Sequence, residues 1–196
     1  MKFFWCTILV AFLCSCHQEN LTYDKPYFDF DSLVHKQVQL LSQHNCKVVK
    51  ETFLNGKADS ALLLPDTIQW KYELDAFQQL DAINKPLFKG NYQEQDQDDE
   101  HSNLLVHSYL FRPKSKMKSP VAEVKFFYQD GRKKLKRIKS VFSEENLLFS
   151  TSRKLTIEFG ELQGIPIISG YRVEGFQKMI LSDTVKFAIR GKMLFR

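Results

Sequence analysis

The sequence of 196 residues lacks the signatures of the common enzyme classes. It contains no Gly-x-Ser-x-Gly turn for a serine nucleophile, no His-Glu-x-x-His zinc pair, no Cys-x-x-Cys pair and no glycine-rich phosphate loop. Its five histidines include no pair at the spacing of metal ligands. We therefore expect a protein that binds, rather than an enzyme, with no metal ion and no cofactor.

Cysteine is also scarce. Three of the four cysteines, Cys6, Cys14 and Cys16, lie within the first 16 residues, so Cys46 is the one thiol expected in the mature domain. An intramolecular disulfide scaffold is therefore excluded. Cys46 precedes an apolar strand, where it is either a small hydrophobic core residue or a reactive thiol. Because 43% of the residues are hydrophobic, we expect one folded domain rather than a disordered chain.

The N-terminus carries a targeting signal. Lys2 precedes an apolar run over residues 3–13. As a helix this run is about 16 Å long, too short for a bilayer core of about 30 Å, and it fits the apolar part of an export signal. The next residues, Leu13-Cys14-Ser15-Cys16, resemble a bacterial lipobox, in which the last cysteine receives lipid.

This resemblance implies a lipoprotein signal peptide over residues 1–15 and a lipidated tether over residues 16–26. Acyl chains on Cys16, including a palmitate-type chain on its amine, would hold the protein stably at a membrane, because two or more chains are enough for this. His17 after the cysteine, in place of Asp, favours the outer membrane. The alternative is an ordinary cleaved signal with an incidental cysteine.

The first half of the mature chain combines two helical patterns with one hairpin. Apolar spacing predicts a helix capped by Asp31 or Ser32, and a second helix that starts at a capping box in 66–69 and ends before residue 84. Between them, Asn55-Gly56 predicts a two-residue turn that joins strands near 46–54 and 58–64. The polar segment 90–103 predicts a mobile loop.

From residue 104 onward, segments of strand length alternate with short turns. The expected strands lie near 104–112, 120–129, 132–142, 147–159, 165–180 and 184–195. Such short connections join antiparallel neighbours, and alternating polarity gives the strands one buried and one wet face. We predict a single α+β domain over residues 27–196. It contains an antiparallel β-meander of about six strands, with two N-terminal helices and a small hairpin packed on one face.

Two charged segments are candidate binding sites. Six cations fall within eight residues: Arg132, Lys133, Lys134, Lys136, Arg137 and Lys139. They would suit an anionic surface such as lipid headgroups; the alternative is a solvated strand whose lysines block edge pairing. Five carboxylates in 94–100 have the density of a calcium site, but the EF-hand pattern is missing, so a solvated loop is the alternative.

An Asp-Ser/Thr-aliphatic tripeptide occurs four times, which is more than the composition predicts by chance. It resembles the O-glycosylation site of exported Bacteroidota proteins, and this resemblance implies Ser32, Ser60, Thr67 and Thr184 as acceptors. The same residue types are also favoured at helix caps and turns.

Several short motifs occur in order through the first half of the chain: the lipobox, Lys25-Pro26-Tyr27-Phe28-Asp29, Asn55-Gly56-Lys57, Trp70-Lys71-Tyr72-Glu73-Leu74 and Asp81-Ala82-Ile83-Asn84-Lys85-Pro86. Together they resemble a group of small Bacteroidota lipoproteins. The resemblance implies a place in the cell envelope and transfers no catalytic or ligand-binding residue. We therefore expect a lipid-anchored interaction module of the outer membrane, on either its periplasmic or its surface side, with an envelope protein as partner and no nucleic acid. The alternative, given 17 Phe and seven Tyr, is a carrier or sensor of an amphiphile held between sheet and helices.

Overall fold

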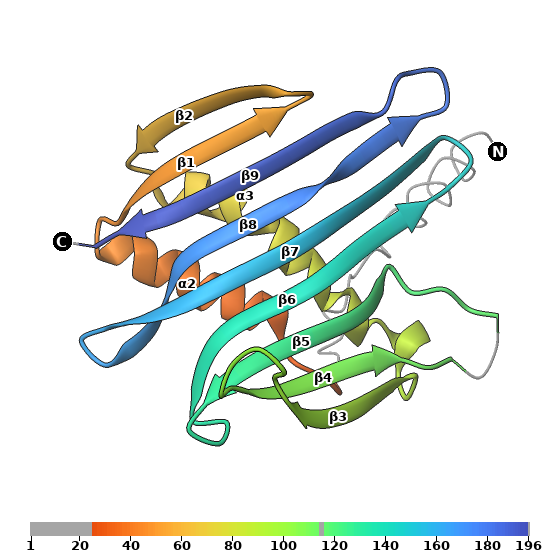
Figure 1. The fold of residues 1–196 in the computed structure, drawn as a ribbon, viewed down its shortest axis with the longest axis horizontal. Helices are drawn as coiled ribbons and strands as arrows, with labels where there is room; N and C mark the ends of the chain where they lie inside the picture. The colour runs from red at the N-terminus through yellow and green to blue at the C-terminus, as the bar shows by residue number, and fades with distance from the viewer. Residues whose placement is uncertain (1–24, 114–115, 196) are drawn as a thin grey trace, which may run out of the picture.

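Residues 25–113 and 116–195, which the computed structural model describes, form one large antiparallel sheet with two helices behind it (Figure 1). The α+β class predicted from the sequence is confirmed at this level. The predicted signal peptide, Cys16 and most of the tether lie outside the described residues. Among the described residues, no helix has both the length and the apolar character needed to cross a bilayer.

The sheet has nine strands in the order β2-β1-β9-β8-β7-β6-β5-β4-β3. Their bounds are β1 Lys47–Leu54, β2 Lys57–Leu63, β3 Tyr92–Asp98, β4 Leu105–Phe111, β5 Val121–Gln129, β6 Lys134–Glu145, β7 Phe149–Leu162, β8 Ile165–Met179 and β9 Val185–Leu194. From β3 to β9 each strand pairs with the next in the chain, so the predicted meander is present.

The prediction of about six strands is wrong in two places. The β1–β2 hairpin does not pack on a face of the sheet, because β1 pairs with β9 along its full length and so extends the sheet. An open edge on β9 would expose unpaired N–H and C=O groups, which β1 satisfies. At the other edge, the segment 90–103, predicted as a loop, contains β3, which pairs with β4 over seven residues.

Two α-helices, α2 (Phe30–Gln43) and α3 (Thr67–Gln78), lie on the same face of the sheet. The N-cap of α2 is Asp29, whose side chain accepts from the backbone N–H of Ser32, so the predicted caps Asp31 and Ser32 are wrong by two to three residues. The predicted capping box of Asp66 and Gln69 is confirmed at α3. Two 3₁₀ turns follow, η1 (Gln79–Asn84) and η2 (Pro86–Phe88).

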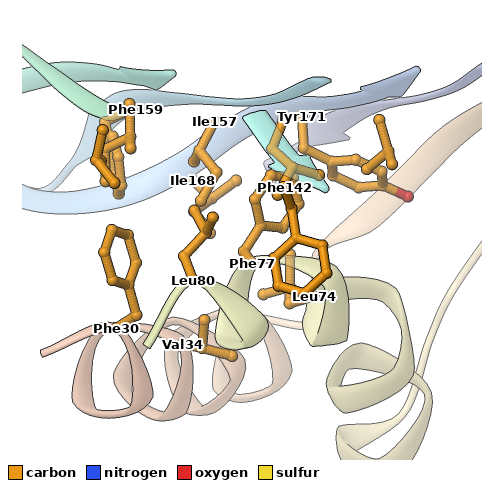
Figure 2. Close-up of a cluster of buried hydrophobic side chains, with 14 of the residues drawn as sticks. Phe30, Val34, Leu74, Phe77, Leu80, Phe142, Ile157, Phe159, Ile168 and Tyr171 are labelled. Atoms are coloured by element: carbon orange, nitrogen blue, oxygen red, sulfur yellow. The ribbon is translucent and has the colours of Figure 1, made fainter. Parts of the chain in front are cut away.

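Apolar side chains fill the space between helices and sheet. Figure 2 shows Phe30 and Val34 of α2 and Phe77 of α3 directed toward the sheet residues above them. Twelve large side chains of this layer are fully buried, including Trp70, Phe126 and Ile157. The predicted helix-covered apolar face is therefore present, and it is the hydrophobic core of the domain.

Polar groups also hold the two layers together. The buried Gln37 of α2 donates from Nε2 to the Pro166 carbonyl (3.1 Å) and accepts from the Ile168 N–H (2.8 Å). These bonds satisfy the backbone of β8 beside its irregularity opposite Glu158 and Phe159. Lys50 of β1 and the Tyr171 hydroxyl of β8 both bond to the Glu73 carboxylate of α3, at 2.6 and 2.5 Å.

The β1–β2 turn forms at the Asn-Gly pair from which it was predicted. Asn55 and Gly56 both have positive φ, 47° and 85°, as the predicted two-residue hairpin turn requires. Gly191 of β9 has a different role, because a Cβ there would lie 2.2 Å from the ring of Tyr171. The missing side chain therefore gives the Tyr171 ring its place over β9.

Candidate anion-binding groove

The face of the sheet that carries no helix is hollowed into a groove of about 1180 Å³. The groove is formed by six neighbouring strands, β1 and β5 to β9. Its side chains alternate with those of the core: on β7, Leu155 and Ile157 are buried toward the helices, so Lys154, Thr156 and Glu158 project into the groove. Figure 1 shows this face toward the reader, with both helices behind it.

One register row crosses the groove through its middle. Strand pairing places Arg190 of β9 opposite Arg172 of β8, then Thr156 of β7, Lys139 of β6 and Lys125 of β5. We call these five residues the central row. On its β1 side the row ends at Glu51, which lies opposite Arg190. Four of its five members are cations, and residues directly opposite in antiparallel strands have Cβ atoms only about 5 Å apart.

Two like-charged pairs in the central row are directly opposed, Lys125 with Lys139 and Arg172 with Arg190. Like charges at such positions destabilise a sheet. Glu174 lies near both arginines, at 3.5 and 3.9 Å, and so offsets part of their repulsion. The Lys139 ammonium lies 5.2 Å from the ring centre of Phe127, a cation–π contact that leaves its charge uncompensated by a carboxylate.

The whole groove has an excess of positive charge. Seven cationic and four acidic side chains line it. Lys125 pairs with Glu123 at 3.2 Å and Arg137 with Glu158 at 3.4 Å. Within the described part of the chain, Lys139, Lys154 and Lys192 take part in no ion pair. Their ammonium groups are therefore available to the oxygens of an anionic ligand.

The structure separates the six cations of the predicted basic segment. Arg137 and Lys139 line the groove. Arg132 and Lys133 lie in the turn before β6, where the Arg132 guanidinium donates to Asp96 and lies beside His107. Lys134 and Lys136 share Glu161, at 3.2 and 3.8 Å.

Sequence reasoning missed most of the groove. Its other cations, Lys125, Lys154, Arg172, Arg190 and Lys192, lie on four different strands. No charge run marks them, because each alternates with apolar residues of its own strand. The period-2 alternation was the only available signal: it indicates one buried and one wet face for each strand, and it does not bring these cations together.

The acidic segment is mostly committed to internal contacts. Asp96 of β3 accepts from Arg132 and lies 2.9 Å from Nδ1 of His107. Hydrogen bonds from Arg132 and His107 lower the pKa of the Asp96 carboxyl. Asp99 accepts a hydrogen bond from the Ser102 hydroxyl. The acidic segment is therefore an edge strand, paired with β4, and the turn that follows it.

A second acidic cluster lies beside the start of the described chain. Asp29, Asp31 and Asp81 place carboxylate oxygens within 4.8 Å of one another. The Lys25 ammonium bonds to all three, at 2.6, 2.7 and 2.9 Å. Partial burial raises the pKa of Asp29, but hydrogen bonds from Lys25 and Ser32 outweigh it and lower that pKa to about 2. A lysine therefore satisfies this cluster and fastens the end of the predicted tether to the domain.

The four predicted O-glycosylation sites are accessible, whereas the thiol of Cys46 is not. Ser32, Ser60, Thr67 and Thr184 are all exposed. The Ser32 hydroxyl donates to Asp29 at 2.7 Å, and the Thr67 hydroxyl lies 2.7 Å from that of Ser42. Cys46 is fully buried, and burial raises the pKa of its thiol, so Cys46 has the surroundings of a core residue rather than of a reactive thiol.

Comparison with known proteins assigns neither a family to the chain nor a ligand to the groove. No protein-family model matches the chain, and neither a curated protein nor a solved structure matches it significantly.

Proposed function

We propose that this protein is a lipid-anchored envelope protein of the outer membrane that acts as a binding module, and that the groove is its binding surface. The observation that carries the proposal is the central row, in which two like-charged pairs are held in register at a cost to folding. A ligand with negative charge would remove this cost on binding. The anchor is the lipidated Cys16 expected from the lipobox.

The shape of the groove favours an extended ligand. Six strands spaced at about 4.8 Å place the first and last walls about 24 Å apart. Cations are spread along this length, from Lys125 on β5 to Lys192 on β9. A chain of several negatively charged units can meet them in succession, whereas a single small anion can meet only one or two. We therefore assign the groove to an acidic polysaccharide.

Fluorescence anisotropy of labelled heparin, added to the purified mature protein, tests this assignment. We expect binding that weakens with salt, and a loss of at least tenfold in affinity in the double variant Lys139→Gln/Arg172→Gln. The matched control, Lys36→Gln/Lys71→Gln, removes the same charge from exposed positions on the helices. We expect it to bind within about twofold of the unmodified protein.

Equal losses in the two double variants would contradict a specific groove and indicate attraction by net charge alone. Absence of binding to heparin would overturn the polysaccharide assignment. The control variant is expected to unfold within about 0.5 kcal/mol of the parent, because surface substitutions rarely exceed this. The groove variant is expected to be at least as stable as the parent, because it removes one member of each like-charged pair. Loss of affinity would then not reflect loss of fold.

The anchor is tested separately by the intact mass of protein expressed in a Bacteroidota host. We expect a mature chain that begins at Cys16 and carries a diacylglyceryl group and a further acyl chain. The Cys16→Ser variant should lack both and should leave the membrane fraction. An unmodified Cys16 in the parent protein would refute lipidation. Added hexoses on Ser32, Ser60, Thr67 or Thr184 would appear in the same spectra.

A second candidate function, carriage of an amphiphile, has one observation in its favour. A cleft of about 480 Å³ lies beside α3 on the helix-covered side, where Phe149, Phe187 and Ile189 supply apolar walls and Arg153 a positive charge. Its volume lies within the range of small-molecule pockets. A lipid that co-purifies in native mass spectra, and is lost in the Phe187→Glu variant, would support the carrier over the binding module.

A further inference from the structure

Two neighbouring turns at one end of the sheet expose large aliphatic side chains. They are the turn between β6 and β7 and the turn between β8 and β9, which Figure 1 shows at the same end of their strands. Leu147 is 91% exposed and Leu181 is 95% exposed. We call the five aliphatic residues of this end the apolar tips: Leu147, Leu148, Met179, Ile180 and Leu181.

The apolar tips form one patch rather than scattered exposed residues. The Ile180 N–H donates to the Leu148 carbonyl at 2.9 Å, and Phe149 pairs with Met179 in the ladder between β7 and β8. All five side chains are more than half exposed. They therefore add little to the core, although their exposure to water is unfavourable. Contiguous apolar surface of this kind marks a site of contact with another molecule or with lipid.

From this surface we infer that the apolar tips insert into the membrane leaflet that holds the lipid anchor. The tips project from the ends of hairpins, so they fit a soft apolar layer. Their charged neighbours are mixed, with Glu144, Glu145 and Asp183 against Lys178 and Lys186. Insertion is therefore driven by apolar burial, with no requirement for anionic lipid.

The point where the tether joins the domain allows the tips to reach the membrane. Lys25 bonds to Asp81 of η1, and Gln79 of the same turn accepts a hydrogen bond from Arg153 of β7 at 2.7 Å. Arg153 is six residues from Leu147 along the chain, about 20 Å of extended strand. The nine residues from Cys16 to Lys25 can span at most about 30 Å. This step depends on the anchor of the proposed function.

Insertion of the tips would fix the orientation of the domain. A tether alone lets the domain turn freely beside the bilayer. With the hairpin ends in the lipid, the strands of the sheet rise from the membrane and the groove opens to the side. An extended polysaccharide could then reach the central row without first displacing the membrane.

Tryptophan fluorescence gives a direct test with the lipidated, full mature chain in phosphatidylcholine vesicles. Of the two tryptophans in the sequence, Trp5 lies in the predicted signal peptide, and Trp70 is fully buried and serves as the reference. We expect brominated phosphatidylcholine to quench at least half of the added emission of the Leu181→Trp variant. The control Leu62→Trp, at a 59% exposed position on the edge strand β2, should remain unquenched.

Each outcome either supports or overturns insertion of the apolar tips into the bilayer. Quenching of Leu181→Trp alone supports insertion, while quenching of both variants or of neither overturns it. The Leu147→Ser variant of the Leu181→Trp protein should lose most of the quenching if the two turns insert together. Failure of the anchor is distinguished by intact mass: if Cys16 is unmodified but vesicles still quench position 181, the tips bind lipid without the anchor.

Discussion

The two faces of the same sheet show opposite uses of charge. On the helix-covered side, Lys25 pairs with three aspartates and Lys50 pairs with Glu73. On the helix-free side, Arg172 faces Arg190 and Lys125 faces Lys139. The covered face is arranged for stability. The free face retains unfavourable charge pairs, and a surface that binds an anion would need them.

Alternating residues of single strands create this difference. Ile157 of β7 is fully buried under the helices, and its neighbour Thr156 stands in the central row. Substitutions at neighbouring positions should therefore separate stability from binding.

Ile157→Ala should lower the unfolding free energy by about 2–5 kcal/mol, because it removes a buried side chain and leaves a cavity. Thr156→Ala should change it by less than about 0.5 kcal/mol. Urea denaturation followed by circular dichroism measures both. Similar losses in the two variants would show that the free face contributes to stability as much as the covered face does.

Gly191→Ala should cost about 1–3 kcal/mol, because the new methyl group overlaps the ring of Tyr171 on the covered side. Tyr171→Phe is the control, since it removes only the hydroxyl that donates to Glu73. If the ring contact is decisive, thermal unfolding should show a larger loss for Gly191→Ala than for Tyr171→Phe. The reverse order would assign the main contribution to the Tyr171–Glu73 hydrogen bond.

The smallest expected effect is a loss of stability in acid, where protonation of Asp29 weakens its ion pair with Lys25. The pKa of Asp29 is about 2 in the folded protein against 3.8 ordinarily, so its contribution to stability is present above about pH 4. The contribution is lost as the pH falls through about 2. Hydrogen exchange at the first turn of α2 should therefore accelerate over this range. In the Lys25→Met variant the same change should occur at higher pH, and an unshifted profile would refute the role of Lys25.

Much of the meander could be predicted because its signals are local. The six strands expected after residue 104 agree with β4 to β9 to within a few residues, since short turns such as Asp130-Gly131 separate runs of alternating polarity. β3 was missed because its side chains beyond Tyr92 are polar on both faces. Its position depends on the backbone bonds that it makes to β4, and residue type does not reveal those bonds.

The candidate site was less predictable than the fold. The run from Arg132 to Lys139 is the densest cationic segment of the sequence and was predicted as a binding site. Four of its six cations nevertheless pair elsewhere or lie in a turn, outside the groove. Arg172 and Arg190 are isolated in the sequence, and become neighbours because β8 and β9 pair in one particular register. A shift of one residue would send either side chain to the other face.

Local features follow from the residues themselves: the positions of most strands and turns, the alternation along each strand and the capping box of α3. Spacing and backbone preference fix such features over a few residues. The export signal and lipobox remain expectations from the sequence. Only the tertiary structure decided that β1 closes against β9, that the central row crosses the sheet, and that Leu148 and Ile180 meet at one end. These contacts join segments that are distant in the chain, and their register depends on burying one complete face of the sheet at once.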